Sequence, residues 1–412
     1  MISQHPEVIA AIAGTMRSSL SRRRLLGAAG LTGAALVASA CGASDEALSS
    51  GAGGAAGGGL PQNEAPDLSA QDKTASWSNW PLYIDIDDAS GTRPTLDEFM
   101  KLSGTDVTYT EDVNDNNEFY AKVRTQLEQG QDIGRDIVVL TDWMAAQWIQ
   151  SGFAEKLDKG LIPNWTNLLP KFFYTSFDPG RQYSLPWQSG FGALGWNKAK
   201  LQETLGVDTL TSIDQLFDPK LKGRISVLSE MRDTMGILMA YQGADPTNFT
   251  TDQWNKALEL LTQQVDNGQI RQVSGNDYAG ALESGDLIAV IGWSGDMIQL
   301  GDAFGVGLPE TGGTLWTDNM LIPALAQHKT NAELIMNYYY DPKVAAQVAA
   351  YVQYICPVSG AQEEMKSIDP ALADNQWIFP TPETLSKAFV FMTLTDQQNV
   401  EYQKQFQKAI GG

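Results

Sequence analysis

Aromatic rings and carboxylates occur together along the 412-residue chain at positions that could bind an organic cation. Most of these positions follow a predicted buried strand, and open α/β sheets bind ligands beyond the carboxyl ends of their strands. The residues are Trp80, Tyr83 and Asp85; Thr141, Asp142 and Trp143; Glu230 and Asp233; Trp293 and Asp296; and, in a predicted turn, Trp316 and Asp318. Arg232 is the one basic residue in these segments.

Each residue type has a role in cation binding and a plainer structural alternative. A desolvated cation–π contact contributes about 0.5–2 kcal/mol, and carboxylates make charge-assisted hydrogen bonds to ammonium groups. Tryptophans more often pack in a core, and strand-end acids often cap helices. The other tryptophans are therefore predicted to pack, and Asp142 is interpreted as a cap. The packing tryptophans are Trp165, Trp187, Trp196, Trp254 and Trp377.

Composition excludes several classes of function. The chain has 28 Lys and Arg against 49 Asp and Glu, for a net charge of −21, and such a surface repels nucleic acid. It has only two His (His5 and His328) and two Cys (Cys41 and Cys356), with no CxxC, HExxH, GxSxG or GxGxxG motif. His328 is predicted to lie in a surface-like loop. We therefore expect no catalytic residues, no cofactor and no metal site.

The N-terminus resembles an export signal followed by a flexible tether. Residues 22–24 are arginines ahead of a mildly apolar run, as in a twin-arginine signal, and the run is too short to span a membrane comfortably. Ala-Ser-Ala-Cys at residues 38–41 resembles a lipobox, which predicts a lipoprotein signal over 1–40 and lipid on Cys41. Gly- and Ala-rich residues 41–72 are predicted to form a flexible tether. A plain secreted protein is the alternative.

Periodicity predicts an α/β body. Strands are expected at residues 136–141, 224–228 and 287–291, and helices at 251–265, 331–340, 342–352 and 395–410. Phe119, Val123 and Leu127 recur at four-residue spacing, which indicates one face of a further helix. Alternation of strands and helices favours mainly parallel sheets, and the length favours two lobes.

Six segments in order resemble the spermidine/putrescine-binding proteins of bacterial ABC importers, the polyamine branch of the extracellular solute-binding family. They are NW at 79–80 with YID at 83–85, DIVV at 136–139, FDPKLKGRI at 217–225, WSGD at 293–296, GGTLWTD at 312–318 and IPA at 322–324. The resemblance implies a two-lobed, type II periplasmic-binding-protein-like fold: each lobe a mainly parallel sheet flanked by helices, joined by crossing hinge strands. Lobe 1 would comprise 73–192 plus 318–362, and lobe 2 would comprise 193–317 plus 363–412.

The resemblance also implies a set of ligand-binding residues. They are Trp80, Tyr83, Thr141, Trp143, Glu230, Asp233, Trp293, Asp296, Trp316, Asp318 and Tyr354. In this scheme Trp293 and Trp316 flank the polyamine chain, and Glu230 with Asp233 receives an amine. Pro81, Leu82 and Phe391 depart from the family pattern and make one end of the predicted site drier.

These expectations together predict a monomeric, extracytoplasmic binding protein without enzymatic activity. It would be periplasmic or at the cell surface, held to the membrane by lipid on Cys41, and would deliver putrescine or spermidine to the membrane permease of an ABC importer. A carrier of another amine-bearing solute, such as an amino acid derivative or opine, stays open. That solute carries a carboxylate, for which Arg232 is the available partner. A secreted hydrolase is a more distant alternative: Glu230 and Asp233 are acids, but three residues apart they fit one helical turn better than the two sides of a scissile bond.

Overall fold

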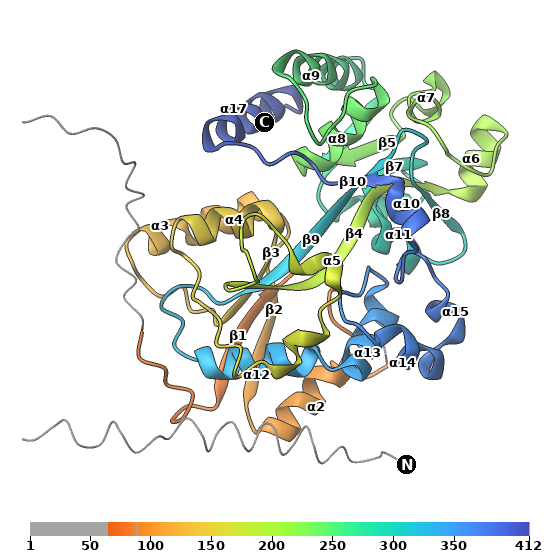
Figure 1. The fold of residues 1–412 in the computed structure, drawn as a ribbon. Coiled ribbons are helices and arrows are strands. Elements are labelled where there is room, and N and C mark those ends of the chain that lie inside the picture. Colours follow the sequence, from red (N-terminus) through yellow and green to blue (C-terminus); the bar gives the residue numbers. More distant parts are fainter. Residues whose placement is uncertain (1–64, 88, 412) are drawn as a thin grey trace, which may run out of the picture. The chain divides into compact units, whose positions relative to one another are not determined.

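The computed structural model describes residues 65–87 and 89–411, and Figure 1 shows their fold. The predicted signal, Cys41 and the tether up to residue 64 lie outside the described residues. The strands are β1 (Thr74–Asn79), β2 (Asp106–Glu111), β3 (Ile137–Thr141), β4 (Ser184–Asn197), β5 (Ile225–Leu228), β6 (Ile270–Ser274), β7 (Ala289–Trp293), β8 (Phe304–Gly307), β9 (Gly313–Leu321) and β10 (Ala388–Phe389).

The longer helices lie between these strands and after them. They are α2 (Pro94–Ser103), α3 (Asn116–Glu128), α4 (Asp142–Gln150), α6 (Lys198–Leu205), α8 (Met231–Tyr241), α9 (Thr251–Asp266), α12 (Lys329–Tyr339), α13 (Pro342–Val352), α14 (Ala361–Ile368) and α17 (Asp396–Ala409). Shorter helical segments are η1 (Pro163–Asn167), α5 (Pro170–Phe173), α7 (Ile213–Leu216), η2 (Pro219–Leu221), α10 (Tyr278–Glu283), α11 (Ser294–Gln299), α15 (Pro370–Ala373) and α16 (Pro382–Ser386).

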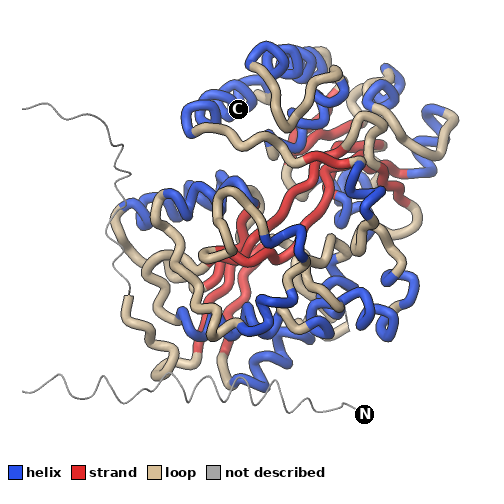
Figure 2. Tube along the Cα trace, in the orientation of Figure 1, coloured by secondary structure: helices blue, strands red, loops and turns tan. Residues whose placement is uncertain are grey.

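The described strands form one mixed sheet that passes through both parts of the body (Figure 2). Its order is β2-β1-β3-β9-β4-β7-β5-β6, with β8 beside β4 and β10 beside β9. Pairing is parallel within β1–β3 and within β5–β7, and it is antiparallel where β9 meets β3 and where β4 meets β9 and β7. We call these parts the β1–β3 half and the β5–β7 half; β4 and β9 cross between them.

The predicted elements agree with the structure except around β9. The strands expected at 136–141 and 224–228 appear as β3 and β5, whereas the one expected at 287–291 appears two residues later as β7. The turn predicted around Trp316 and Asp318 is wrong, because both residues lie within β9. That segment lacks a long apolar run, and its extended form depends on hydrogen bonds to β3 and β4.

Helix α3 shows how local sequence and packing agree. Asp115 caps its N-terminus by accepting hydrogen bonds from the N–H groups of Asn117 (2.8 Å) and Glu118 (3.1 Å). The predicted apolar face is buried, with Phe119, Val123 and Leu127 all turned inward. Figure 1 shows α3 and α4 on one side of the β1–β3 half and α2 and α12 on the other. Helices therefore cover both faces of this half, as its buried, mainly parallel strands require.

The predicted packing tryptophans fall into two groups. Trp187, Trp196 and Trp254 are buried, and Trp187 lies edge-on to Trp77 with ring centroids 5.0 Å apart. Trp165 and Trp377 are half-buried, and Trp377 packs against Phe191 with centroids 5.6 Å apart. Burying aromatic rings of this size supplies much of the favourable energy of such a core.

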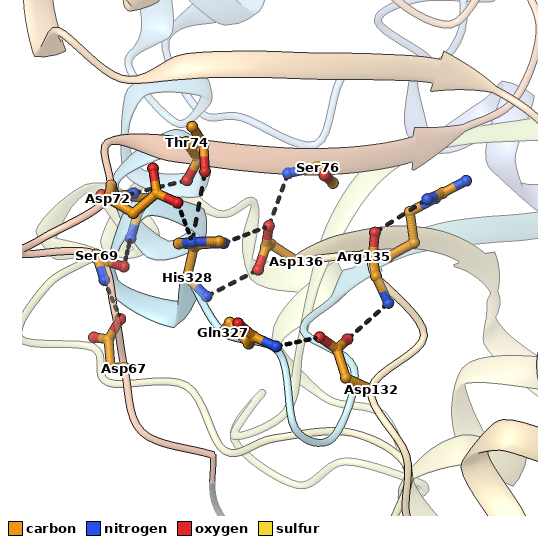
Figure 3. A network of polar contacts seen from close by, with 12 residues as sticks. Asp67, Ser69, Asp72, Thr74, Ser76, Asp132, Arg135, Asp136, Gln327 and His328 are labelled. Carbon is orange, nitrogen blue, oxygen red and sulfur yellow. Dashed lines mark hydrogen bonds and ion pairs between the residues drawn. The ribbon is translucent and has the colours of Figure 1, made fainter.

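A polar network ties the start of the described chain to the body (Figure 3). Asp136 accepts hydrogen bonds from the N–H groups of Ser76 (2.8 Å) and His328 (2.9 Å). The ring of His328 lies 3.3 Å from Asp136 through Nδ1 and 3.4 Å from Asp72 through Nε2. His328 lies in a turn just before α12, as predicted, and its side chain is 16% exposed. Its partners Asp72 and Asp136 lie far away in the sequence, so local composition did not reveal these contacts.

The predicted lobe boundaries fall within regular elements. Residue 192 lies in β4, residue 317 lies in β9, and residue 362 lies near the start of α14. Within the described part of the chain, no helix is both long and apolar enough to cross a membrane.

Candidate functional site

A cavity opens where the ends of the parallel strands meet the crossing strands. It holds about 430 Å³ of empty space, part of which is open to solvent. Its walls are Trp80, Pro81, Tyr83, Asn116, Thr141, Glu230, Asp233, Asn276, Trp293, Asp296, Trp316, Asp318 and Tyr354. The structure thus brings every predicted ligand-binding residue except Trp143 to one cavity. Their binding role stays a prediction.

Strand ends position most of these side chains. Trp80 follows β1, Thr141 ends β3, and Trp293 ends β7. Glu230 and Asp233 follow β5, as the N-cap and in the first turn of α8. The carboxyl ends of the parallel strands in the two halves converge on the cavity, which is the arrangement that open α/β sheets use for ligands.

Strand β9 brings Trp316 and Asp318 to the cavity by a different route. Asp318 is in register with Thr141 on β3 and with Gln188 on β4, so it lies in the middle of the crossing sheet. Gly190 on β4 is in register with Trp316 on β9. A Cβ on Gly190 would lie 2.8 Å from Cδ1 of Tyr354 and would clash with the Trp316 ring. Glycine at this position lets both rings approach the sheet.

Asp318 is a buried carboxylate without a cationic partner among the described residues. It is 4% exposed and accepts hydrogen bonds from Thr141 Oγ1 (2.7 Å) and the Tyr83 hydroxyl (2.8 Å). Burial raises the pKa of Asp318 to about 7, which these two hydrogen bonds oppose and the charges of Asp142 and Asp233 reinforce. An ionised Asp318 would therefore be stabilised by a positive charge in the cavity.

Asp233 and Asp296 are held by neutral donors. Asp233 accepts hydrogen bonds from Trp293 Nε1 (2.8 Å) and from the hydroxyl of Thr314. Asp296 accepts from the hydroxyls of Tyr278 and Tyr354, both at 2.6 Å, and from Asn276 Nδ2 at 3.2 Å. Burial raises the pKa of both carboxyl groups, and the hydrogen bonds oppose that rise.

Glu230 differs from the other three acids because a cation lies beside it. Its Oε1 is 3.7 Å from Nη1 of Arg232, and the two side chains are only 10% and 12% exposed. Burial raises the pKa of Glu230 to about 7 and the Arg232 charge opposes this, while burial lowers the pKa of Arg232 to about 10. Trp143, predicted as a ligand contact, faces this guanidinium, with 4.1 Å between Arg232 Cζ and the Trp143 ring centroid.

Aromatic rings form a chain of contacts around the cavity. Ring centroids lie 6.3 Å apart for Trp80 and Trp293, 6.5 Å for Trp293 and Trp316, 5.3 Å for Trp316 and Tyr354, and 5.4 Å for Tyr354 and Tyr83. The contacts are edge-on, so each ring is held in place by its neighbour. Such walls suit the methylene groups and ammonium ends of an aliphatic amine.

Sequence reasoning missed two lining residues, Asn116 and Asn276. Asn116 donates to Thr141 Oγ1 (2.8 Å) and accepts from the Thr141 N–H (3.1 Å), so it fixes that hydroxyl. Asn276 supports Asp296. Asn276 comes shortly after β6 and Asn116 shortly after β2. The strand-end rule would have found them had it been applied to amides as well as to acids.

The remaining singled-out residues have other roles. Asp142 is wrongly interpreted as a cap: it is the first residue of α4, the N-cap Thr141 makes no side-chain cap bond, and Asp142 Oδ1 accepts from Asn319 Nδ2 at 2.8 Å. Pro81 lines the cavity, Leu82 is 49% exposed, and Phe391 packs against Phe249 with ring centroids 5.3 Å apart. Among the described residues, no group of His, Cys, Asp and Glu could hold a metal ion.

The cavity therefore combines four carboxylates with aromatic walls, and it has no Lys, Arg or His among its lining residues. Its chemistry is that of a receptor for a positively charged, partly aliphatic molecule. A carboxylate and an aromatic face both attract an ammonium group, by charge-assisted hydrogen bonds and by cation–π interaction.

Comparisons with known proteins agree with this chemistry. The chain is 26% identical over 342 residues to the spermidine/putrescine-binding periplasmic protein of Salmonella typhimurium, covering 82% of this chain and 92% of that one. A Listeria monocytogenes protein assigned as a spermidine/putrescine ABC transporter has a TM-score of 0.71 at 24% identity, covering 82% and 99% of the two chains. The Agrobacterium protein AgtB, solved with agropinic acid, has a TM-score of 0.64 at 19% identity, with the same coverage.

These likenesses confirm the predicted α/β architecture of the type II periplasmic binding proteins. The sequence profile of the bacterial extracellular solute-binding proteins matches residues 95–376, more than half of the chain. Members of this family bind solutes and are not enzymes, so the predicted absence of enzymatic activity is confirmed. The chain belongs to the bacterial extracellular solute-binding proteins, the solute-capturing components of ABC transporters.

Proposed function

We propose that this protein binds a polyamine, putrescine or spermidine, in the cavity and delivers it to the membrane permease of an ABC importer. The observation that carries the proposal is Asp318, a carboxylate at 4% exposure that receives only two hydroxyl hydrogen bonds. Burying an ionised carboxylate without a partner is costly, so a cationic group of the ligand would stabilise Asp318. The polyamine-binding relatives support the same ligand class.

The other acids of the cavity can bind the second ammonium group of the proposed ligand. Asp233 and Asp296 lie in the same cavity, each held by neutral donors, and the rings of Trp293 and Trp316 line the space with them. A diamine carries an ammonium at each end and methylenes between them. Each ammonium can then meet a carboxylate while the methylenes are buried against rings, which is worth about 0.8 kcal/mol per CH₂.

A second candidate is a carrier of an amine that also bears a carboxylate, such as an opine. It is favoured by Arg232, whose Nη1 is buried and makes no hydrogen bond. However, Arg232 is not among the lining residues, and Glu230 and Trp143 already contact its guanidinium. The polyamine is therefore the better match to the cavity.

Native mass spectrometry and titration calorimetry on the mature chain test these two candidates. We expect a purified sample to retain a polyamine, or to bind putrescine or spermidine with micromolar or tighter affinity once its ligand has been removed by unfolding and refolding. An amino acid matched in size should not bind. Binding of opines with no response to either polyamine would overturn the proposal in favour of the second candidate.

We also propose that Cys41 carries the lipid that anchors the protein outside the cytoplasm. The motif at residues 38–41 supports this, and the family is extracellular or periplasmic. Cys41→Ser should move the protein from the membrane fraction to the soluble fraction, as seen by blotting after fractionation. Unchanged partitioning would rule out the lipid anchor.

A third proposal is that the two halves close around the ligand, with hinges near residues 192, 317 and 362. Support comes from the cavity, whose walls include Trp80 and Thr141 from one half and Glu230 and Trp293 from the other. Small-angle scattering should show a smaller radius of gyration after putrescine is added to ligand-free protein. An unchanged radius at saturation would contradict ligand-driven closure.

A further inference from the structure

Arg232 makes a contact across the cleft that does not involve the cavity itself. It lies in α8 of the β5–β7 half, and its guanidinium Cζ is 4.1 Å from the ring centroid of Trp143, in α4 of the β1–β3 half. Neither residue lines the cavity, so the contact does not require a ligand. Trp is the most favourable ring for a cation–π interaction, and the planar guanidinium of Arg stacks readily on aromatic faces.

Contacts within its own half hold the guanidinium in place. Arg232 Nη2 donates a 2.9 Å hydrogen bond to Asn399 Oδ1 in α17, and Nη1 forms the 3.7 Å ion pair with Glu230. With only 12% of its side chain exposed, the charge is largely shielded from water. Because a desolvated cation–π contact is stronger than an exposed one, this contact can contribute to holding the two halves together.

The position of Arg232 places it at the edge of the ligand space. Glu230 lines the cavity, and Arg232, which pairs with Glu230, also contacts the ring of Trp143. The halves also approach each other closely between the segments that follow β6 and β2: a Cβ on Gly275 would be 3.1 Å from the backbone oxygen of Asn114. The two halves therefore meet at the cavity rim as well as through β4 and β9.

We propose that Arg232 and Trp143 form a latch that slows release of the bound solute. Arg232 acts as a positioning residue: it holds the halves together and leaves capture of the solute to the cavity residues. This inference rests on the proposed polyamine function for its ligand, but the contact itself exists without one. Breaking it should speed opening, and with it solute release, without slowing association.

Stopped-flow tryptophan fluorescence with putrescine measures both rates, since several tryptophans line the cavity. Arg232→Met keeps an unbranched apolar side chain and removes the charge, and we expect release to be about 10- to 30-fold faster with no loss in the association rate. Trp143→Leu should match it, and Trp143→Phe should restore part of the effect. The double variant should release no faster than either single variant, because both changes remove the same contact.

Arg93→Met is the matched control. Arg93 lies over the ring of Tyr109 at 4.7 Å and pairs with Glu111 at 3.1 Å, so it makes the same kinds of contact, but within the β1–β3 half. Its loss should leave putrescine release unchanged. Additive effects in the Arg232/Trp143 double variant, or faster release in Arg232→Met without any change in Trp143→Leu, would overturn the latch.

Scattering from the empty protein separates failure of the latch from failure of the proposed ligand. Folded Arg232→Met and Trp143→Leu, checked by circular dichroism, should have a larger radius of gyration than empty wild type. If wild type binds no polyamine, the proposed function fails and the radius alone decides the latch. The latch is overturned if the empty variants have the same radius of gyration as empty wild type and, provided that putrescine binds, also release it at the wild-type rate. This outcome does not depend on which ligand the protein carries.

Discussion

Two buried aspartates lie near opposite ends of β3, and their surroundings differ. Asp136 precedes the strand and Asp318 pairs with its last residue, Thr141, and each is 4% exposed. Asp136 accepts hydrogen bonds from two backbone N–H groups, and the His328 ring lies beside it (Figure 3). Asp318 receives two hydroxyl hydrogen bonds and has no cation within ion-pair distance among the described residues.

The difference separates a structural acid from one left for a ligand. Two backbone N–H groups and the His328 ring supply the partners of the Asp136 carboxylate within the fold. Asp136 thereby links β3 to β1 and to the start of α12, where His328 also contacts Asp72. Asp318 faces a cavity lined by rings and other acids, and burial raises its pKa to about 7. Equal burial therefore says little about role; what distinguishes the two is whether the protein itself supplies the partner.

The largest expected effect is the loss of polyamine affinity in the Asp318→Asn variant. Removing one partner of a buried ion pair costs about 3–5 kcal/mol, which corresponds to a loss of polyamine affinity of roughly 10²- to 4 × 10³-fold. Titration calorimetry with putrescine and spermidine measures it. Asp142→Asn is the matched control, because Asp142 is close enough to influence Asp318 but does not line the cavity, and it should change affinity little. Wild-type affinity in folded Asp318→Asn would show that the polyamine site assigned here is wrong.

The pH dependence of binding is the next largest effect. Burial raises the Asp318 pKa from 3.8 to about 7, so the stability that the protonated group contributes to the empty fold is present below pH 4 and is lost as pH rises through 7. Ligand binding has the opposite sign, since a cationic ligand favours the ionised acid. Putrescine affinity should be roughly 30-fold weaker at pH 5.5 than at pH 8.

A variant of Glu230 identifies the titrating acid, because burial raises its pKa to about 7 as well. In Glu230→Gln the pH dependence should persist, since Asp318 is intact. A flat profile in this variant would assign the titration to Glu230 and remove the contrast drawn between Asp318 and the other acids.

Removing the Trp316 ring should weaken polyamine binding less than removing the Asp318 carboxylate. Trp316→Leu loses one cation–π contact and the edge-on packing with Tyr354, for an expected affinity loss of about 3- to 30-fold. Trp316→Phe, which keeps a ring, should fall between wild type and the leucine variant. A loss as large as that of Asp318→Asn would mean that the ring, and not the charge, dominates recognition.

The smallest expected effect on affinity belongs to Asp136→Asn. An amide in this place would turn one acceptor into a donor facing N–H groups, at a cost of about 1–3 kcal/mol in the free energy of unfolding, as urea denaturation would show. Putrescine affinity should stay within about twofold, because Asp136 does not line the cavity. Weakened binding without loss of stability would make Asp136 part of the site and contradict the comparison.

The sequence by itself determined the α/β class, most helices and strands, and most of the cavity residues. Local patterns sufficed for these: the buried run of β3, the four-residue spacing in α3, and the rule that ligands meet strand ends, which selects Trp80, Glu230 and Trp293. These signals depend on neighbours along the chain, which a sequence displays directly.

Only the tertiary structure decided where the remaining groups point and what they contact. Asp318 reaches the cavity because β9 pairs with β3 and β4, Trp143 faces Arg232 instead of the cavity, and His328 is held by Asp72 and Asp136. Each of these contacts joins residues far apart in sequence. Whether a buried acid is satisfied by the protein or left for a ligand depends on such contacts, and no local pattern of residues encodes them.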